Sequence, residues 1–222
     1  MGDHSHQSHI PKFGIAGLLV TLGIIYGDIG TSPLYVMKAI VGERIIDRDL
    51  ILGGMSCILW TLTLQTTIKY ILLILRADNK GEGGIFALYA LVRRTKVKWL
   101  LFPAIIGGAA LLGEGIITPA ISVSSAIEGL RESYPDIQTI PIIIGILFSL
   151  FAIQQFGTKS IGKFFGPVML TWFLMLSSLG IYFLSQDFSV LAAINPYYAI
   201  NLLTAYPEGF WILGAVFLCT TG

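Results

Sequence analysis

Two acidic residues lie inside strongly apolar stretches of the sequence, where a charge is costly. Asp28 follows an almost purely hydrocarbon run at 15–25, and Glu114 lies within the apolar stretch 99–127. No lysine or arginine falls at a comparable depth. A carboxylate at the centre of a bilayer costs several kcal/mol, which protonation or a bound cation relieves. The two acids therefore indicate a cation or proton site, or else carboxyl groups kept protonated and hydrogen-bonded to backbone.

The neighbours of Asp28 predict a break in its helix. Gly27 and Gly30 relax the helix, and Pro33 lacks the N–H that would complete the hydrogen-bond ladder. Irregular backbone at membrane depth persists only inside protein or along a cavity, so we expect the carbonyls freed by the break to become ligands. A mere packing kink is the alternative. Hydroxyl groups follow the break at Thr31, Ser32 and Tyr35.

A second polar stripe begins at Glu114. Thr118 and Ser122 follow it at intervals of four, so on a helix the three side chains share one face. One interpretation is that both hydroxyls bond to their own helix carbonyls. The other is a row of hard oxygen ligands facing a cavity, which suits a partly dehydrated hard cation. No cluster of Cys or His in the sequence offers a soft-metal site.

The elements that must position these residues are membrane-spanning helices. Hydrophobic residues make up 55% of the 222 residues and charged ones only 12%, whereas soluble domains are about 25% charged. We expect an all-α polytopic membrane protein with a cytoplasmic tail at 1–13 and a transport domain at 14–222. Its expected spans, of which the first is broken and the sixth is cut off at Gly222, cover 14–41, 50–75, 99–127, 138–155, 163–185 and a stretch from about Pro207. We therefore expect the N-terminal portion of a longer protein.

The loops predict an orientation and exclude some functions. Lysine and arginine gather in the loops 76–98 and 154–163, whereas 186–207 has none. Basic loops mark the cytoplasmic side, which places the N-terminus in the cytoplasm. A net charge of +1 disfavours a nucleic acid partner, and no nucleophile–base set indicates an enzyme. Cys57 and Cys219 lie in apolar runs and should be free, packed thiols. Short interfacial helices are expected near IFALYALVRR and NPYYAINLL.

Three long motifs resemble signature stretches of a known family. YGDIGTSPLY, IKYILLILRADNKGEGGIFAL and GEGIITPAISVSSAIEGL are similar to those of the KUP (Kup/HAK/KT) potassium uptake permeases. The resemblance implies a LeuT-like inverted-repeat fold of the amino acid–polyamine–organocation superfamily, in which helices one and six are broken. It also implies K⁺ uptake coupled to H⁺ influx, a homodimer at full length, and a cyclic dinucleotide as a conceivable regulator. The implied ion-site residues are Asp28, Tyr35, Glu114, Thr118, Ser122 and Thr221.

The leading hypothesis is a K⁺/H⁺ symporter of the plasma membrane without a cofactor. Asp28, Tyr35, Thr118, Ser122 and Thr221 would bind K⁺. Glu114 would carry the proton, because burial favours the protonated form of a carboxyl group, with Asp28 as the alternative or coupled acid. An amino acid or organic-cation carrier, or a K⁺ channel-like permease without proton coupling, remain alternatives.

Overall fold

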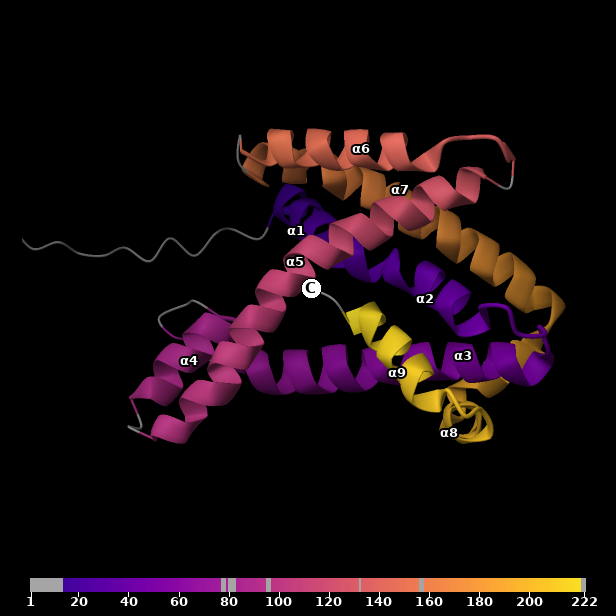
Figure 1. Ribbon diagram of the computed structural model, residues 1–222, viewed down its shortest axis with the longest axis horizontal. Helices are drawn as coiled ribbons and strands as arrows, with labels where there is room; N and C mark the ends of the chain where they lie inside the picture. The colour runs from indigo at the N-terminus through magenta and orange to yellow at the C-terminus, as the bar shows by residue number, and fades with distance from the viewer. Residues whose placement is uncertain are drawn as a thin grey trace, which may run out of the picture.

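The computed structural model describes residues 14–76, 79, 83–94, 97–131, 133–155 and 158–220, and all regular structure in these ranges is helical. Figure 1 shows long helices that cross at steep angles, with the short α9 near the centre. The first half contains α1 (Ile15–Ile29), α2 (Ser32–Val41), α3 (Arg48–Thr61), its π-helical and 3₁₀ continuations η1 (Leu62–Leu73) and η2 (Ile74–Arg76), and α4 (Ile85–Arg93). The second half contains η3 (Lys98–Leu100), α5 (Leu101–Leu130), α6 (Thr139–Gln154), α7 (Thr158–Gln186), η4 (Phe188–Ile194), α8 (Pro196–Ala205), α9 (Gly209–Phe217) and η5 (Leu218–Thr220).

Several of these helices could cross a membrane. In the described part, Arg48–Arg76, Leu101–Leu130 and Phe165–Gln186 are long and apolar enough, and two bent pairs raise the number to as many as five. The helix in the fourth predicted span, α6, has 16 residues, or about 24 Å at 1.5 Å per residue. That is short of the ~30 Å hydrocarbon core.

The segment after α7 differs from the sequence-based expectation of a loop with one interfacial helix. Phe188–Ile194 and Pro196–Ala205 form two helices that meet at 75° and together are apolar enough to count as one bent span. The bend falls at Asn195, whose side chain accepts a 3.0 Å hydrogen bond from the Tyr197 N–H and so caps α8. The expected helix at 195–203 is confirmed as α8, and the one after Gly84 as α4.

The predicted break in the first span is confirmed. Helix α1 ends at Ile29 and α2 begins at Ser32, with Pro33 in its first turn, where a missing N–H costs nothing. The chain also bends by 50° between the segments 17–23 and 26–41. This bend lies ahead of the break, so the chain turns before Asp28, and α1 and α2 contact different neighbours.

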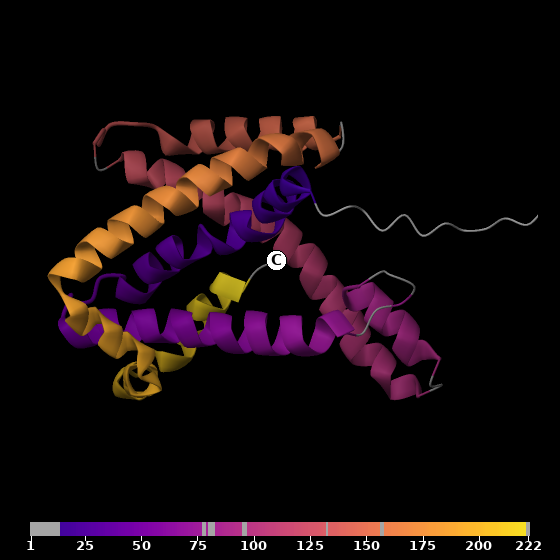
Figure 2. The same cartoon turned by 180° about the vertical axis from the view of Figure 1, so that it is seen from behind.

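Helix α1 packs along α7. The two backbones come close at Gly23, where a Cβ atom would lie 2.8 Å from the Gly166 Cα. Figure 2 shows α7 running diagonally beside α1 at the front of the view. Trp172 of α7 also donates its indole N–H to the Gly30 carbonyl at 3.2 Å. These contacts attach the first half of the broken span to α7.

Helix α2 belongs to a separate core. It packs against α3 and α9, α8 contributes to the same core, and the fully buried Val36, Ile40 and Val216 are part of that core. Both cysteines are free and buried in this core, which confirms their expected role as small apolar side chains. Two long-range hydrogen bonds fasten α3 to the bend at 194–195, from Ser56 Oγ to the Asn195 carbonyl at 3.0 Å and from Trp60 Nε1 to the Ile194 carbonyl at 2.9 Å.

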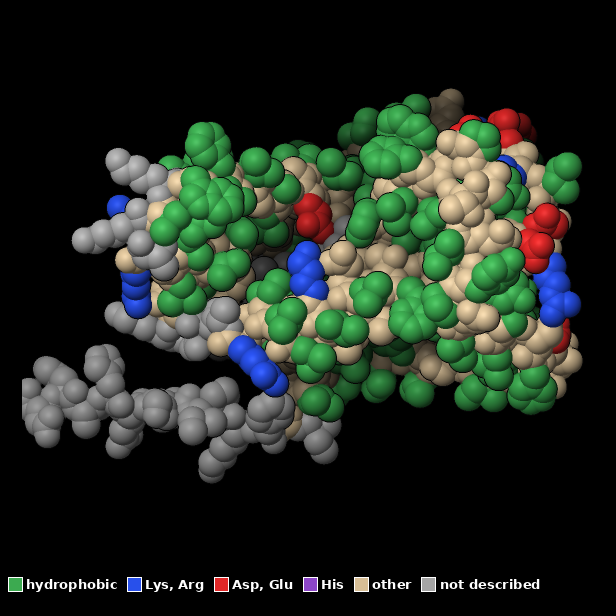
Figure 3. Space-filling model, turned by 90° about the horizontal axis from the view of Figure 1, so that it is seen from below, with side chains coloured by type: hydrophobic (Ala, Val, Ile, Leu, Met, Phe, Trp, Pro, Cys, Tyr) green, Lys and Arg blue, Asp and Glu red, His purple; other side chains and the backbone are tan. Residues whose placement is uncertain are grey.

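Much of the remaining surface is apolar. Hydrophobic side chains cover most of the face in Figure 3, and charged ones are few. Phe148 on α6 and Phe183 on α7 are 75% and 62% exposed. Apolar surface on this scale indicates contact with lipid or with further protein segments.

Candidate functional site

The last turn of α1 and the first turn of α2 are joined by hydroxyl groups. Ser32 Oγ donates to the Asp28 carbonyl at 2.8 Å, and Asp28 Oδ1 lies 3.5 Å from the same hydroxyl. Tyr35 O–H donates to Ser32 Oγ at 2.8 Å, and both side chains are buried. The structure therefore brings together Asp28 and Tyr35, two of the predicted site residues, with Ser32 between them.

The carbonyls freed by the break have donors within the protein. Thr31 Oγ1 lies 3.2 Å from the Gly27 carbonyl and 3.1 Å from the Asp28 carbonyl. The Gly30 carbonyl accepts from Trp172. A carbonyl oxygen has two lone pairs. Those of the Asp28 carbonyl are taken up by the Thr31 N–H and the Ser32 hydroxyl, whereas the Gly27 and Gly30 carbonyls each accept from one side-chain donor. The hydroxyl and indole contacts hold the broken backbone in one conformation.

Glu114 and Thr118 line a hollow between α5 and α9. The hollow has a volume of about 410 Å³. Its other residues are Ala110, Gly113, Ile117, Gly214, Phe217, Leu218 and Thr220. The predicted polar stripe on α5 thus faces the apolar wall of α9 for at least one turn, which leaves Glu114 as the acid of this hollow.

Two predicted ligands lie apart from this hollow or beyond the described chain. Ser122, one turn further along α5, is half-buried and is not among the residues that line the hollow. Its neighbour Ile121 packs against the core that contains Tyr35, so α5 runs from the hollow toward α2. Thr221 lies outside the described residues, but Thr220 before it reaches the hollow and donates to the Phe217 carbonyl at 2.7 Å.

Sequence reasoning missed two residues that organise this region. Trp172 lies in the predicted span 163–185. The one sign in the sequence that it makes a specific contact was its indole N–H, which needs a hydrogen-bond acceptor when it is buried. Arg44 follows the end of α2 in a short loop, where the sequence shows no sign of a distant partner, yet it pairs with Glu208 at the start of α9. Within the ranges described above, no three His, Cys, Asp or Glu side chains form a metal cluster. Any cation site here would therefore rely on hydroxyl and carbonyl oxygens beside single carboxylates.

Comparison with known proteins identifies the family. A family model described as "K+ potassium transporter integral membrane domain" matches residues 15–222. The chain belongs to this potassium transporter family. Its members are transporters rather than enzymes, and the chain is part of an integral membrane protein.

Curated relatives in the family are closely similar over nearly the whole chain. A "Probable potassium transport system protein Kup" from Flavobacterium psychrophilum is 65% identical over 222 residues, covering 100% of this chain and 34% of the relative. The proteins of the same name from Cytophaga hutchinsonii and Enterococcus faecalis are 63% and 54% identical, covering 99% and 95% of this chain and 34% of each relative. The chain thus spans about a third of the length of these relatives. No solved structure matches it.

Proposed function

We propose that the protein, at its full length, takes up K⁺ together with H⁺ across the plasma membrane. The observation that carries this proposal is Asp28 at a break in the first span, beside the buried hydroxyls of Ser32 and Tyr35. Hard oxygen donors around a single carboxylate suit a monovalent cation that has lost part of its water. The names of the Kup relatives, which refer to potassium transport, support the choice of ion.

The K⁺ ligands in this proposal come from both halves of the site. Asp28 and Tyr35 supply oxygens from the broken span, and Thr118 and Ser122 supply them from α5. Thr221 adds a hydroxyl beyond η5. The proposal requires these groups to surround one ion site. Residues of α9 line the hollow next to Glu114 and Thr118, and this placement favours such an arrangement.

The proton is assigned to Glu114, with Asp28 as a coupled second acid. An acidic side chain within a membrane span is by default a candidate for proton transfer. Glu114 borders a hollow of about 410 Å³ that can admit water, and α9 forms the opposite wall. Protonation of Glu114 would change the charge next to the K⁺ ligands and so couple the two ions.

The remaining parts of the proposal concern architecture and assembly. The broken first span favours a LeuT-like inverted repeat of the amino acid–polyamine–organocation superfamily, because such transporters bind ions at discontinuous helices. The basic loops favour a cytoplasmic N-terminus. A homodimer and regulation by a cyclic dinucleotide are further expectations for the full-length protein. No cofactor other than the transported ions is proposed.

The test is K⁺-limited growth of an uptake-deficient host that carries the full-length protein. Asp28→Asn and Glu114→Gln are the variants, and Asp136→Asn, at an exposed position in the loop after α5, is the matched control. We expect each site variant either to prevent growth at low K⁺ or to make growth at low K⁺ independent of pH. The control should grow normally. Intact growth and pH dependence in both site variants would refute the site.

Two alternatives make different predictions for the same cells. An amino acid or organic-cation carrier would show uptake of Rb⁺ that amino acids or amines inhibit, whereas a K⁺ transporter should show mutual competition of K⁺ and Rb⁺ only. A channel-like permease would continue to carry K⁺ when the proton gradient is collapsed at a constant membrane potential. A symporter should slow under that condition, because it loses the part of its driving force that the pH difference supplies.

A further inference from the structure

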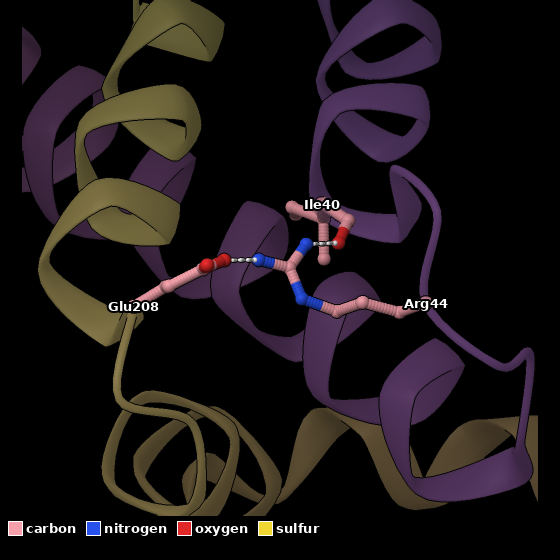
Figure 4. Close-up of polar contacts among 3 residues, drawn as sticks. All are labelled: Ile40, Arg44 and Glu208. Atoms are coloured by element: carbon pink, nitrogen blue, oxygen red, sulfur yellow. Dashed lines mark hydrogen bonds and ion pairs between the residues drawn. The ribbon is translucent and has the colours of Figure 1, made fainter.

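Arg44 joins the end of α2 to the start of α9. Gly42 has a positive φ of 51°, which turns the chain back beneath α2 after its last residue. Arg44 Nη1 then donates to the Ile40 carbonyl at 2.7 Å, while Nη2 pairs with the Glu208 carboxylate (Figure 4). The guanidinium carbon lies 5.7 Å from the centre of the Tyr206 ring. We call this set of three contacts the Arg44 latch.

The simplest explanation of the latch is a helix cap combined with a surface ion pair, and such pairs contribute little to stability. The Arg44 side chain, however, is only 22% exposed. Its planar fork bonds a carbonyl and a carboxylate at once and lies over an aromatic ring, a combination that lysine cannot reproduce. A single guanidinium thus fixes two helix ends relative to each other.

The two helices joined by the latch carry different parts of the proposed site. Helix α2 holds Ser32 and Tyr35, and α9 supplies Gly214 and Phe217 to the wall opposite Glu114. Between the latch and the site, α2 shares a buried apolar core with α9 and η5, formed by Val36, Ile40, Ile212, Val216 and Cys219. A displacement at the latch would therefore be transmitted along both helices to the site.

The break at Gly30–Thr31 makes this contact necessary. Helix α1 is held by α7, whereas α2 packs on α3 and α9. The helical backbone ladder is interrupted here, and side-chain hydrogen bonds of Ser32 and Tyr35 join the start of α2 to Asp28. The far end of α2 is held by two polar contacts, the latch to α9 and an ion pair of 2.8 Å from Lys38 to Glu128 of α5.

We propose that Arg44 is a positioning residue for transport. By binding Glu208 it sets the distance between α2 and α9. It thereby fixes the position of the Ser32 and Tyr35 hydroxyls relative to the hollow that Glu114 and Thr118 line. The effect on transport rests on the proposed K⁺ uptake function, whereas the effect on helix distance does not.

The distance is tested without transport. In cysteine-depleted full-length protein, spin labels are attached through Glu43→Cys and Phe210→Cys, two exposed positions that flank the latch. Pulsed electron paramagnetic resonance then gives the distribution of label distances. We expect a narrow distribution that Arg44→Ala broadens and that Arg131→Ala, which removes an exposed arginine at the end of α5, leaves unchanged.

Transport is tested by Rb⁺ uptake in cells that express Arg44→Ala, Arg44→Lys, Arg44→Glu, Glu208→Arg and the double charge swap. We expect the KM for Rb⁺ to rise at least about fivefold in Arg44→Ala, a size typical of coupling between sites. Arg44→Lys should be intermediate. The charge swap should recover part of what both single reversals lose. A residue needed only for folding would lower the amount of transporter and hence the maximal rate of uptake, and would leave the KM unchanged.

Each result decides the proposal. Broadened distances together with a raised KM that the charge swap lowers would support it. Two results would overturn it. One is an unchanged distance distribution in Arg44→Ala; the other is a broadened distribution in Arg44→Ala whose KM for Rb⁺ equals that of the control Arg131→Ala. If the parent protein takes up no Rb⁺ but its distances depend on Arg44, the proposed K⁺ uptake fails while the latch stands.

Discussion

Tyr35 donates a 2.8 Å hydrogen bond to Ser32 Oγ, and both side chains are buried where the second half of the broken span begins. The Ser32 hydroxyl has one hydrogen, which it directs to the Asp28 carbonyl at 2.8 Å. A chain of hydrogen bonds thus crosses the break from α2 to the last turn of α1. It holds the carboxylate-bearing turn and the tyrosine in one arrangement although the helix between them is interrupted.

Replacing Tyr35 by phenylalanine tests this chain of bonds. The change keeps the ring in the core and removes the donor to Ser32, which should cost about 0.5–1.5 kcal/mol of unfolding free energy. Thermal unfolding of the full-length protein in detergent measures that loss. If K⁺ binds here, the KM for Rb⁺ uptake should rise as well. Tyr182→Phe, on an exposed ring of α7, is the control, and equal melting temperatures for the two variants would contradict the prediction.

Gly23→Ala tests the contact between α1 and α7. The added Cβ would lie 2.8 Å from the Gly166 Cα, and neither backbone can yield without separating the helices. Overpacking of this kind costs about 1–3 kcal/mol. Gly17→Ala on the same helix is the matched control, because a Cβ there meets nothing within 4 Å. The melting temperature should fall for Gly23→Ala alone, and a fall of the same size for Gly17→Ala would show that the glycine contact is unimportant.

The Asp187 carboxylate caps η4 outside the spans and should make stability depend on pH. Hydrogen bonds from Ser189 hold the pKa of Asp187 below its ordinary value of 3.8, and the charge of Arg48 adds to this. A lowered folded-state pKa means that the contribution is fully present above about pH 4 and is lost as the pH falls through the folded pKa. Asp187→Ala should therefore lower the melting temperature at pH 6, with the difference shrinking as the pH falls below 3.8. The loop variant Asp136→Ala is the comparison, and a difference that stays constant down to the lowest pH would contradict the assignment.

Local features of the structure could be predicted from the sequence. The glycines and the proline around Asp28 predicted the break, because glycine and proline act on the backbone within a few residues. The spacing of Glu114 and Thr118 predicted a shared face, and both side chains do line one hollow. The continuous helix from Arg48 to Arg76 follows directly from its apolar length.

The features that could not be predicted depend on contacts between distant parts of the chain. Trp172 and Gly30 are 142 residues apart, and Arg44 and Glu208 are 164 residues apart. Hydrophobic periodicity carries no information about such pairs, since it reports only which face of a helix is apolar. The bend at Asn195 was missed because an Asn-Pro pair at the start of a helix is equally consistent with a loop.

The sequence by itself determined that this protein is a helical membrane protein, where its first span breaks and which two acids lie within its apolar helices. Composition and local backbone chemistry decide these points, because each depends on a short stretch of residues. Only the tertiary structure decided that α1 belongs with α7 and α2 with α9, and that the end of α9 faces Glu114. These relationships arise from helix packing, in which glycine contacts and buried side chains select one arrangement among many that share the same local pattern.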